Sequence, residues 1–478
     1  MPIEHQAAAA LKWNSAAKLL SQTFSWIVTL VVVRLLAPGD YGLMAITTVV
    51  ISIIAGTAEF GLGSALIQAQ SLNKHELARI AGALGLLNVT CGVALAIAAP
   101  WIAGLFAEPG LEWVIRVSTL TFFLSAIDVV PQSLMTRDMN FRGNAGIELA
   151  TVVTASATTL LLAWLEGGVW ALVIGNLAGA TVRTVLLLVF GTLVMPSFRL
   201  TGIGKHIRFG GQVTAARFLW QLTYQMDTLI AARVLHREVL GIYSVSMHLA
   251  TLPMNKVIGI VNQVAFSAIA RLQDERPRLR ASLLGALRLM AFVAIPTIWG
   301  LSAVAAEFVA VVLGDKWRDA VIPLQLVSIV APARMLMAIL ATATDGIGRT
   351  GLGLRNAIIS ASILPVAFVI GVQWGLVGLA TSWLIAIPLI LAISLPGTCA
   401  ALGLPLRDLF TATKAPLLGG LAMYAAVGAA RLGLDQWPEP ARLPALIAIG
   451  AIAYLIVVRS LDRAIWTDAR RLVSALRG

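Results

Sequence analysis

Two stretches of this 478-residue chain carry the same stripe of polar side chains. Within each stripe the residues are spaced by 4, 3 and 4 positions, which puts them on one face of an α-helix. The two stripes are Lys18, Gln22, Ser25 and Thr29, and Arg217, Gln221, Tyr224 and Thr228. A cation heads each stripe. Because guanidinium and ammonium groups bind phosphate oxygens, such a wall suits an anionic head group.

A third polar stripe follows on the next apolar segment. It consists of His248, Thr251, Asn255 and Asn262, with Lys256 adjacent. Polar stripes can also hold helices together by hydrogen bonds. Because two of the stripes are related and headed by cations, we expect them instead to line a shared central cavity. The predicted substrate-binding residues are Lys18, Gln22, Arg217, Gln221, Tyr224, Asn255 and Lys256.

Acidic side chains also fall inside apolar segments, at Glu59, Asp128, Glu148 and Asp227. Each ionised group near the centre of a bilayer costs about 2.5–3.5 kcal/mol on insertion scales, so it needs a partner or water. These acids could carry a coupling proton or Na⁺, or merely neutralise cations, and the sequence leaves both readings open.

Four further basic residues within apolar segments are Arg116, Arg183, Arg288 and Arg334. For the first three, which lie near the ends of their segments, pairing with acids or snorkelling to the interface is the simpler expectation. For Arg334 the sequence favours neither a structural nor a functional role.

The elements that must position these residues are membrane-spanning helices. The chain is 59% hydrophobic and 12% charged, whereas a soluble domain is closer to half apolar and a quarter charged. One crossing needs about 20 apolar residues. Fourteen segments qualify, approximately 15–36, 43–69, 77–100, 113–135, 143–165, 168–194, 207–233, 241–270, 280–302, 320–344, 354–373, 375–400, 409–431 and 443–460. The fold class predicted is an all-α polytopic membrane protein.

The basic residues predict the orientation. With the N-terminus in the cytoplasm, 22 of the 35 Lys and Arg residues fall in cytoplasmic segments, 7 in outer segments and 6 within spans. The positive-inside rule therefore places both termini in the cytoplasm, as an even number of helices requires. No basic region or cleavage site precedes the first span, so no cleavable signal peptide is expected.

The sequence repeats itself with a shift of 199 residues. Nine of the thirty positions in 15–44 are identical to those in 214–243, including Arg34 with Arg233 and Gly42 with Gly241. Such a repeat predicts two related lobes of six helices in the same orientation. The predicted domains are an N-terminal lobe at 1–200, a C-terminal lobe at 201–400, and two additional helices with a cytoplasmic tail at 401–478.

Several classes of function are not supported. The two cysteines and five histidines show no metal-ligand spacing, so no metal site is predicted. The net charge of +12 is spread over loops, without a patch large enough for nucleic acid. No catalytic motif occurs, and no loop is large enough for a catalytic domain. We expect a non-enzymatic protein without cofactors, driven by a gradient of H⁺ or Na⁺ or by its substrate. In the loop at 303–319, Trp317 is expected to anchor the chain at the membrane interface.

Five short motifs occur in a specific order. They are Arg34–Gly42 (RLLAPGDYG), Glu59–Gln68 (EFGLGSALIQ), Pro131–Leu134 (PQSL) followed by Arg137 and Phe141–Arg142, Gly241–Ser244 (GIYS), and Gly314–Trp317 (GDKW). Together they resemble the polysaccharide transporter branch of the multidrug/oligosaccharidyl-lipid/polysaccharide (MOP) exporter superfamily, and within it the colanic-acid type Wzx flippases. The resemblance extends to about residue 400.

The resemblance implies a MATE-like, V-shaped pair of six-helix lobes in the bacterial inner membrane. It implies that undecaprenyl-pyrophosphate-linked oligosaccharide moves to the periplasmic leaflet by alternating access, for exopolysaccharide, O-antigen or capsule synthesis beside a polymerase and export machinery. The other candidates are a cation-coupled multidrug or small-molecule exporter of the same superfamily, a membrane polymerase or glycosyltransferase, and a non-transporting scaffold. The intramembrane cations argue against the drug exporter, and the short loops argue against the enzyme.

Overall fold

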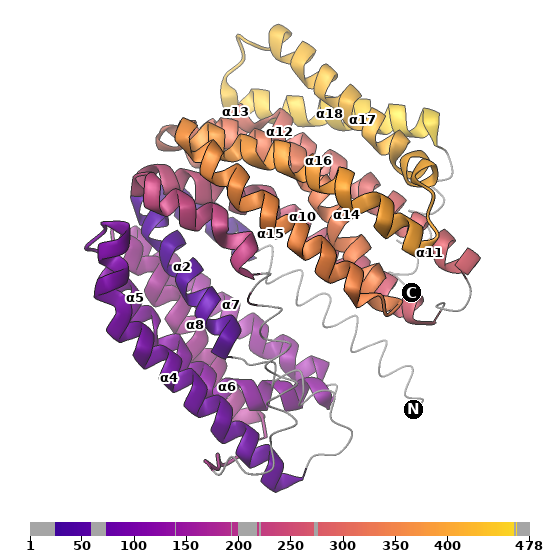
Figure 1. Ribbon diagram of the computed structural model, residues 1–478. Coiled ribbons are helices and arrows are strands. Elements are labelled where there is room, and N and C mark those ends of the chain that lie inside the picture. Colours follow the sequence, from indigo (N-terminus) through magenta and orange to yellow (C-terminus); the bar gives the residue numbers. More distant parts are fainter. Residues whose placement is uncertain are drawn as a thin grey trace. The chain divides into compact units, whose positions relative to one another are not determined.

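In the computed structural model, most of the chain forms helices (Figure 1). The described residues are 24–58, 73–138, 140–192, 194–198, 218, 221–271, 276–462 and 465, without the side chains of 57–58, 141–142, 255–271, 276 and 350. The chain divides into two compact units, Met1–Gly241 and Ile242–Gly478. The predicted division at residues 200 and 400 stays a prediction.

Unit 1 contains eight described helices before α10. They are Phe24–Leu35, α2 (Pro38–Ala58), α4 (Lys74–Phe106), α5 (Leu111–Ser118), α6 (Leu120–Arg137), α7 (Phe141–Trp164), α8 (Val169–Phe190) and a helix at 221–234. Helix α10 (Arg237–Arg271) begins in unit 1 and continues into unit 2.

Unit 2 combines long α-helices with several short helical segments. After α10 come α11 (Arg276–Ala294), the π-helix η1 (Ile295–Trp299), α12 (Gly300–Ala303), α13 (Ala305–Phe308), the π-helix η2 (Val309–Leu313), the 3₁₀-helix η3 (Asp315–Ala320), α14 (Val321–Gly346), α15 (Thr350–Gly371), the 3₁₀-helix η4 (Val372–Trp374), α16 (Gly375–Leu402), α17 (Leu406–Gly433) and α18 (Glu439–Leu461).

The all-α polytopic fold predicted from the sequence is confirmed. Ten segments among the described residues are long and apolar enough to cross a membrane. Each of the fourteen predicted segments overlaps a described helix, although their ends differ by several residues. Helix α4, for example, has 33 residues and begins three residues before the predicted segment, at a capping box of Asn73 and Glu76.

Small residues bring α7 and α8 together as an antiparallel pair in unit 1. Gly175 of α8 faces Ala155 and Thr159 of α7, and a side chain at that position would collide with them. One turn further along α8, Gly179 faces Ala155 and the carbonyl of Thr151. Close approach at small residues is a common way for helices to associate in membranes, since lipid offers no hydrophobic driving force.

The prediction for the segment 303–319 is wrong. It is not a loop but a series of short helices, α13, η2 and η3. Trp317 is completely buried rather than exposed at an interface. The Trp side chain is typical of both membrane interfaces and cores, and its type alone does not distinguish them.

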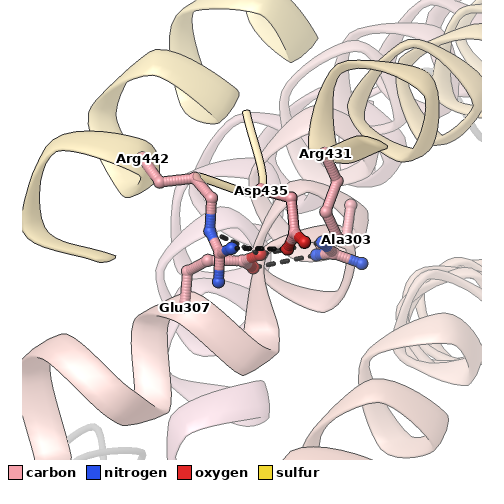
Figure 2. Close-up of polar contacts among 5 residues, drawn as sticks. All are labelled: Ala303, Glu307, Arg431, Asp435 and Arg442. Atoms are coloured by element: carbon pink, nitrogen blue, oxygen red, sulfur yellow. Dashed lines mark hydrogen bonds and ion pairs between the residues drawn. The ribbon is translucent and has the colours of Figure 1, made fainter. Parts of the chain in front are cut away.

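The last two helices are fixed to unit 2 by buried ionic contacts (Figure 2). The carboxylate of Glu307 on α13 is 1% exposed and accepts two hydrogen bonds from Arg431 on α17, at 2.7 and 2.8 Å. Arg442 on α18 lies 3.5 Å away on the other side. Two further ion pairs, Arg280 with Asp408 and Arg288 with Asp462, join α11 to α17 and to the end of α18. The sequence resemblance weakens here, yet these helices are an integral part of unit 2.

We expect Glu307→Gln to lower the unfolding free energy of the protein by about 1–3 kcal/mol, because Arg431 and Arg442, whose side chains are 35% and 15% exposed, lose their shared buried counter-charge. The measurement is thermal unfolding of the detergent-purified protein. The control is Asp315→Asn, since Asp315 pairs with Arg318 at 2.8 Å but both side chains are more than 70% exposed. That control should change the unfolding free energy by less than about 1 kcal/mol. Equal losses for the two variants would contradict the role given to Glu307.

Candidate functional site

The structure describes only part of the predicted substrate-binding set. Lys18, Gln22 and Arg217 lie outside the described residues, as does the predicted coupling acid Glu59. Asn255 and Lys256 are in α10, but their side chains are not described. The remaining predicted residues, Gln221, Tyr224, Asp128, Glu148 and Asp227, all lie in unit 1.

Gln221 belongs to a polar contact between the helix at 221–234 and α2. Its amide donates to the hydroxyl oxygen of Ser52 at 3.3 Å, and the amide of Gln225 donates to the same oxygen at 3.3 Å. Ser52 in turn donates to the carbonyl of Val49 at 2.9 Å. A hydroxyl offers one proton and two lone pairs, so all the hydrogen-bonding capacity of Ser52 is used. Gln225 lies one turn after Gln221 on the same helix face, but it was not in the predicted set; the 199-residue shift relates it to Trp26, which is not polar in the same way.

We expect Ser52→Ala to destabilise unit 1 by about 1–3 kcal/mol, because two amide groups lose their acceptor inside an apolar region. Thermal unfolding of the purified protein measures this loss. Ser362→Ala is the matched control, since Ser362 is exposed and bonds only the carbonyl of Ile358 in its own helix. If Ser52→Ala were as stable as the control, the contact with the two glutamines would not contribute to folding.

Asp227 lies at the centre of the same helix and is 2% exposed. One of its carboxylate oxygens accepts from the backbone N–H of Thr228 at 2.6 Å and from the Thr228 hydroxyl at 3.2 Å. In the related first helix, the Thr29 hydroxyl donates instead to the carbonyl of Ser25 at 2.7 Å. The two stripes are therefore alike in sequence but differ in their hydrogen bonds. Tyr224, one turn before Asp227, is half-buried.

A second polar group in unit 1 joins α6, α7 and α8. The carboxylate of Asp128 on α6 lies 3.8 Å from the guanidinium of Arg183 on α8. One turn along α6, the amide of Gln132 donates to Asn144 on α7 at 3.2 Å. Glu148 lies one further turn along α7 and is exposed. The expectation that Arg183 pairs with an acid is confirmed, and the same holds for Arg288 with Asp462 and Arg116 with Glu112.

Unit 2 contains an intramembrane cation that the sequence did not assign. Arg334 lies at the midpoint of α14, and its guanidinium stacks 4.2 Å from the ring centre of Trp383 on α16. Trp383 is fully buried, and its indole N–H donates to the hydroxyl of Tyr243 on α10 at 2.9 Å. The aromatic pair fixes one face of the guanidinium. Arg334 has no polar neighbours three or four residues away, so a search for polar stripes does not single it out.

The two repeats meet at a pair of equivalent glycines in unit 1. A Cβ on Gly42 of α2 would overlap the backbone carbonyl of Arg237, and one on Gly241 of α10 would overlap that of Pro38. The shift of 199 residues relates Gly42 to Gly241 and Pro38 to Arg237. The two contacts are therefore reciprocal within unit 1.

Charged groups surround this glycine crossing. Arg237 lies 3.7 Å from Glu108 and 3.1 Å from Glu238. A backbone N–H at the start of α10 holds the pKa of the Glu238 carboxyl below its usual range, and the Arg237 guanidinium adds to this effect. Arg237 is the first residue of α10, and Pro38 is the first residue of α2 at the equivalent position of the first repeat.

The fold is that of known membrane transporters. The solved structure titled "Lipid II flippase MurJ, inward closed conformation" matches 95% of this chain and 99% of its own, with a TM-score of 0.75 and 14% identity. An inward-facing multidrug resistance MATE family transporter of the MOP superfamily matches 82% of this chain and 98% of its own, with a TM-score of 0.63 and 15% identity. This likeness shows that the chain has a fold shared with multi-pass membrane transporters.

The sequence comparison narrows this class. A family model described as "Polysaccharide biosynthesis protein" matches residues 31–322, and the chain belongs to this family. The lipopolysaccharide biosynthesis protein WzxC of Escherichia coli (strain K12) is 25% identical over 393 residues, which are 80% of this chain and 79% of that protein. The resemblance to the polysaccharide transporter branch of the MOP superfamily, expected from the short motifs, is confirmed.

Proposed function

We propose that this protein moves an undecaprenyl-pyrophosphate-linked oligosaccharide repeat unit from the cytoplasmic to the periplasmic leaflet of a bacterial inner membrane. The observation that carries the proposal is the family match over residues 31–322 in a chain with a lipid-flippase fold. A polysaccharide biosynthesis protein without a catalytic domain has to act on a precursor made by other proteins. That precursor is amphipathic and cannot cross the bilayer unaided, because its sugars and pyrophosphate would have to enter hydrocarbon.

In this proposal the pyrophosphate binds cations inside the membrane. The repeat and the spacing of the polar stripes are the basis for assigning this role to Lys18, Arg217 and Lys256. We add Arg334 because it lies at the centre of α14. Gln22, Gln221, Tyr224 and Asn255 offer hydrogen bonds to the sugars. The prenyl tail stays in lipid, so only the polar part of the substrate needs a hydrated path.

Transport proceeds by alternating access of the two six-helix lobes, with both termini in the cytoplasm. The 199-residue repeat and the distribution of basic residues support these two features. The protein needs no bound cofactor, and H⁺ or Na⁺ is the candidate coupling ion. A polysaccharide polymerase and the export machinery would use the product at the outer leaflet.

A multidrug or small-molecule exporter is the second candidate, because MATE transporters share the fold. That function favours an apolar cavity with an isolated acid, since drug substrates are mostly apolar or cationic. The guanidinium of Arg334 at the midpoint of a span is unfavourable for a cationic substrate.

Deleting the gene in its native host tests the proposal. We expect completed lipid-linked oligosaccharide to accumulate in the cytoplasmic leaflet and the extracellular polysaccharide to disappear, with both restored by the intact gene. The mass of the accumulated lipid would identify the repeat unit. Normal polysaccharide and an unchanged lipid pool, together with altered drug sensitivity, would contradict the flippase and support the exporter.

A further inference from the structure

A carboxyl group is buried inside unit 1 with one oxygen lacking a hydrogen-bond donor. Asp128 on α6 is 6% exposed. Its Oδ2 lies 3.8 Å from Nε of Arg183, a long ion pair, and its Oδ1 has no hydrogen-bond partner among the described residues. A buried carboxylate that lacks donors pays a large desolvation cost, which a neutral carboxyl avoids. This site is therefore suited to a carboxyl group that also exists in the protonated form.

The hydroxyl of Thr184 can serve both forms of the Asp128 carboxyl group. It contacts the Asp128 carboxyl, and it donates its single proton to the carbonyl of Ala180 at 3.0 Å. While that bond is made, the hydroxyl oxygen can only accept a hydrogen bond. A protonated Asp128 finds an acceptor there, and an ionised Asp128 finds a donor when the hydroxyl turns its proton toward the carboxylate.

A second acidic residue, Glu148 on α7, lies about level with Arg183 on α8. The contacts of Gly175 with Ala155 and of Gly179 with Thr151 define the antiparallel pairing of α7 and α8. Continued by one turn, this pairing places Arg183 at the level of Glu148. Both side chains are exposed, and Glu148 makes no ion pair within the described part of the chain. The guanidinium that lies 3.8 Å from Asp128 therefore has a second acid at about its own level of the α7–α8 pair.

Few other charges lie on the described helices that pack on α6. Helix α4 has charged residues only in its first two turns, and Glu112 and Arg116 of α5 pair with each other at 2.7 Å. On α7 the charged residues are Glu148 and Arg142, and the Arg142 side chain lies outside the description. On α8 the only charge is Arg183. The guanidinium of Arg183 disfavours Na⁺ at the Asp128 carboxylate.

Polar and apolar groups are separated along this part of unit 1. Gln132 and Asn144 are hydrogen-bonded at 3.2 Å and lie one turn from Asp128 and from Glu148, respectively. Met135, Ile147 and Leu187 form a buried apolar cluster between the same three helices. The amide pair offers a polar connection between the two acids.

We propose that Asp128 is a proton-binding site of this transporter, and that Arg183 pairs with Asp128 when it is ionised and with Glu148 when Asp128 carries the proton. A hydronium ion gives its proton to Oδ1 and becomes water. At a later stage of the transport cycle, the protonated carboxyl group returns the proton to a water molecule. The coupling role rests on the proposed function, but the binding of the proton does not.

Infrared difference spectroscopy of the purified, lipid-reconstituted protein tests proton binding without any substrate. A step from alkaline to acidic pH should produce a carbonyl band of a protonated, buried carboxyl group. Asp128→Asn keeps the shape of the side chain and should abolish that band. Glu112→Gln, which removes an ion-paired acid from the same unit, should leave it unchanged. An identical band in wild type and Asp128→Asn would overturn the proposal.

A second variant keeps the test valid if Asp128→Asn fails to fold. In Arg183→Gln the ionised carboxylate loses its cation, so the midpoint of the band should move to more alkaline pH. An unchanged midpoint would also overturn the proposal.

Transport assays separate this proposal from the proposed function. In vesicles that contain the protein and the lipid-linked oligosaccharide, a pH gradient should change the rate of flipping in wild type but not in Asp128→Asn. Flipping that responds equally to the gradient in both proteins would contradict the coupling role while leaving the flippase intact. The infrared band without any flipping would leave the proton site standing and contradict the flippase.

Discussion

Gly42→Ala is expected to remove most of the folded protein from the membrane. The added Cβ would overlap the backbone carbonyl oxygen of Arg237, which cannot move as a flexible side chain can. Overpacking a core typically costs about 1–3 kcal/mol and occasionally more. Because the neighbour here is backbone, and α2 and α10 would have to separate at the crossing of the two repeats, we expect the upper end of this range or beyond.

The same substitution elsewhere on α2 provides the control. Gly56 has no atom within 4 Å of its Cβ position, so Gly56→Ala should be tolerated and should gain helix propensity, of about 1 kcal/mol in soluble helices. Thermal unfolding and the yield of monodisperse protein after detergent extraction measure both effects. If Gly42→Ala and Gly241→Ala folded as well as Gly56→Ala, the reciprocal glycine contact would not hold the repeats together.

Arg334→Gln is expected to reduce polysaccharide export at least tenfold while the amount of protein in the membrane is maintained. A charged residue at the centre of a span costs about 2.5–3.5 kcal/mol on insertion scales, so its removal should not impair insertion. Its loss should impair binding of an anionic head group, because the guanidinium bonds phosphate oxygens in a fork. Arg334→Lys should rescue only in part, since an ammonium group neither forks nor stacks on Trp383 in the same way.

Two measurements distinguish this functional role from a structural one. Export is followed as extracellular polysaccharide, and folding as thermal stability of the purified variant. A variant of Arg334 that is unstable and poorly inserted would assign the residue to packing against Trp383. A stable Arg334→Gln with normal export would remove Arg334 from the substrate-binding set.

Local sequence patterns predicted the helices well. Each of the fourteen apolar runs predicted as a span overlaps a described helix. This agreement is expected, because a membrane helix satisfies its own backbone hydrogen bonds and needs little tertiary information. The repeat was equally informative, since Gly42 and Gly241, aligned by the 199-residue shift, make reciprocal contacts.

The partners of polar side chains could not be predicted in this way. Periodicity shows which face of a helix is polar but not which helix it meets. Ser52 and Gln225 are 173 positions apart, and Glu307 and Arg431 are 124 positions apart. Trp317 shows the same limit, since its residue type suits an interface but its neighbours bury it completely. These contacts depend on tertiary packing, which a single sequence does not reveal.

The most direct test of the central claim is a flipping assay with purified components. Undecaprenyl-pyrophosphate-linked oligosaccharide is placed in both leaflets of vesicles with and without the protein, and a glycosidase that cannot enter the vesicles cleaves the sugars outside. We expect only about half of the oligosaccharide to be cleaved in protein-free vesicles and nearly all of it when the protein is present. Equal cleavage with and without the protein, in vesicles where its folding is confirmed, would contradict a lipid-linked oligosaccharide flippase.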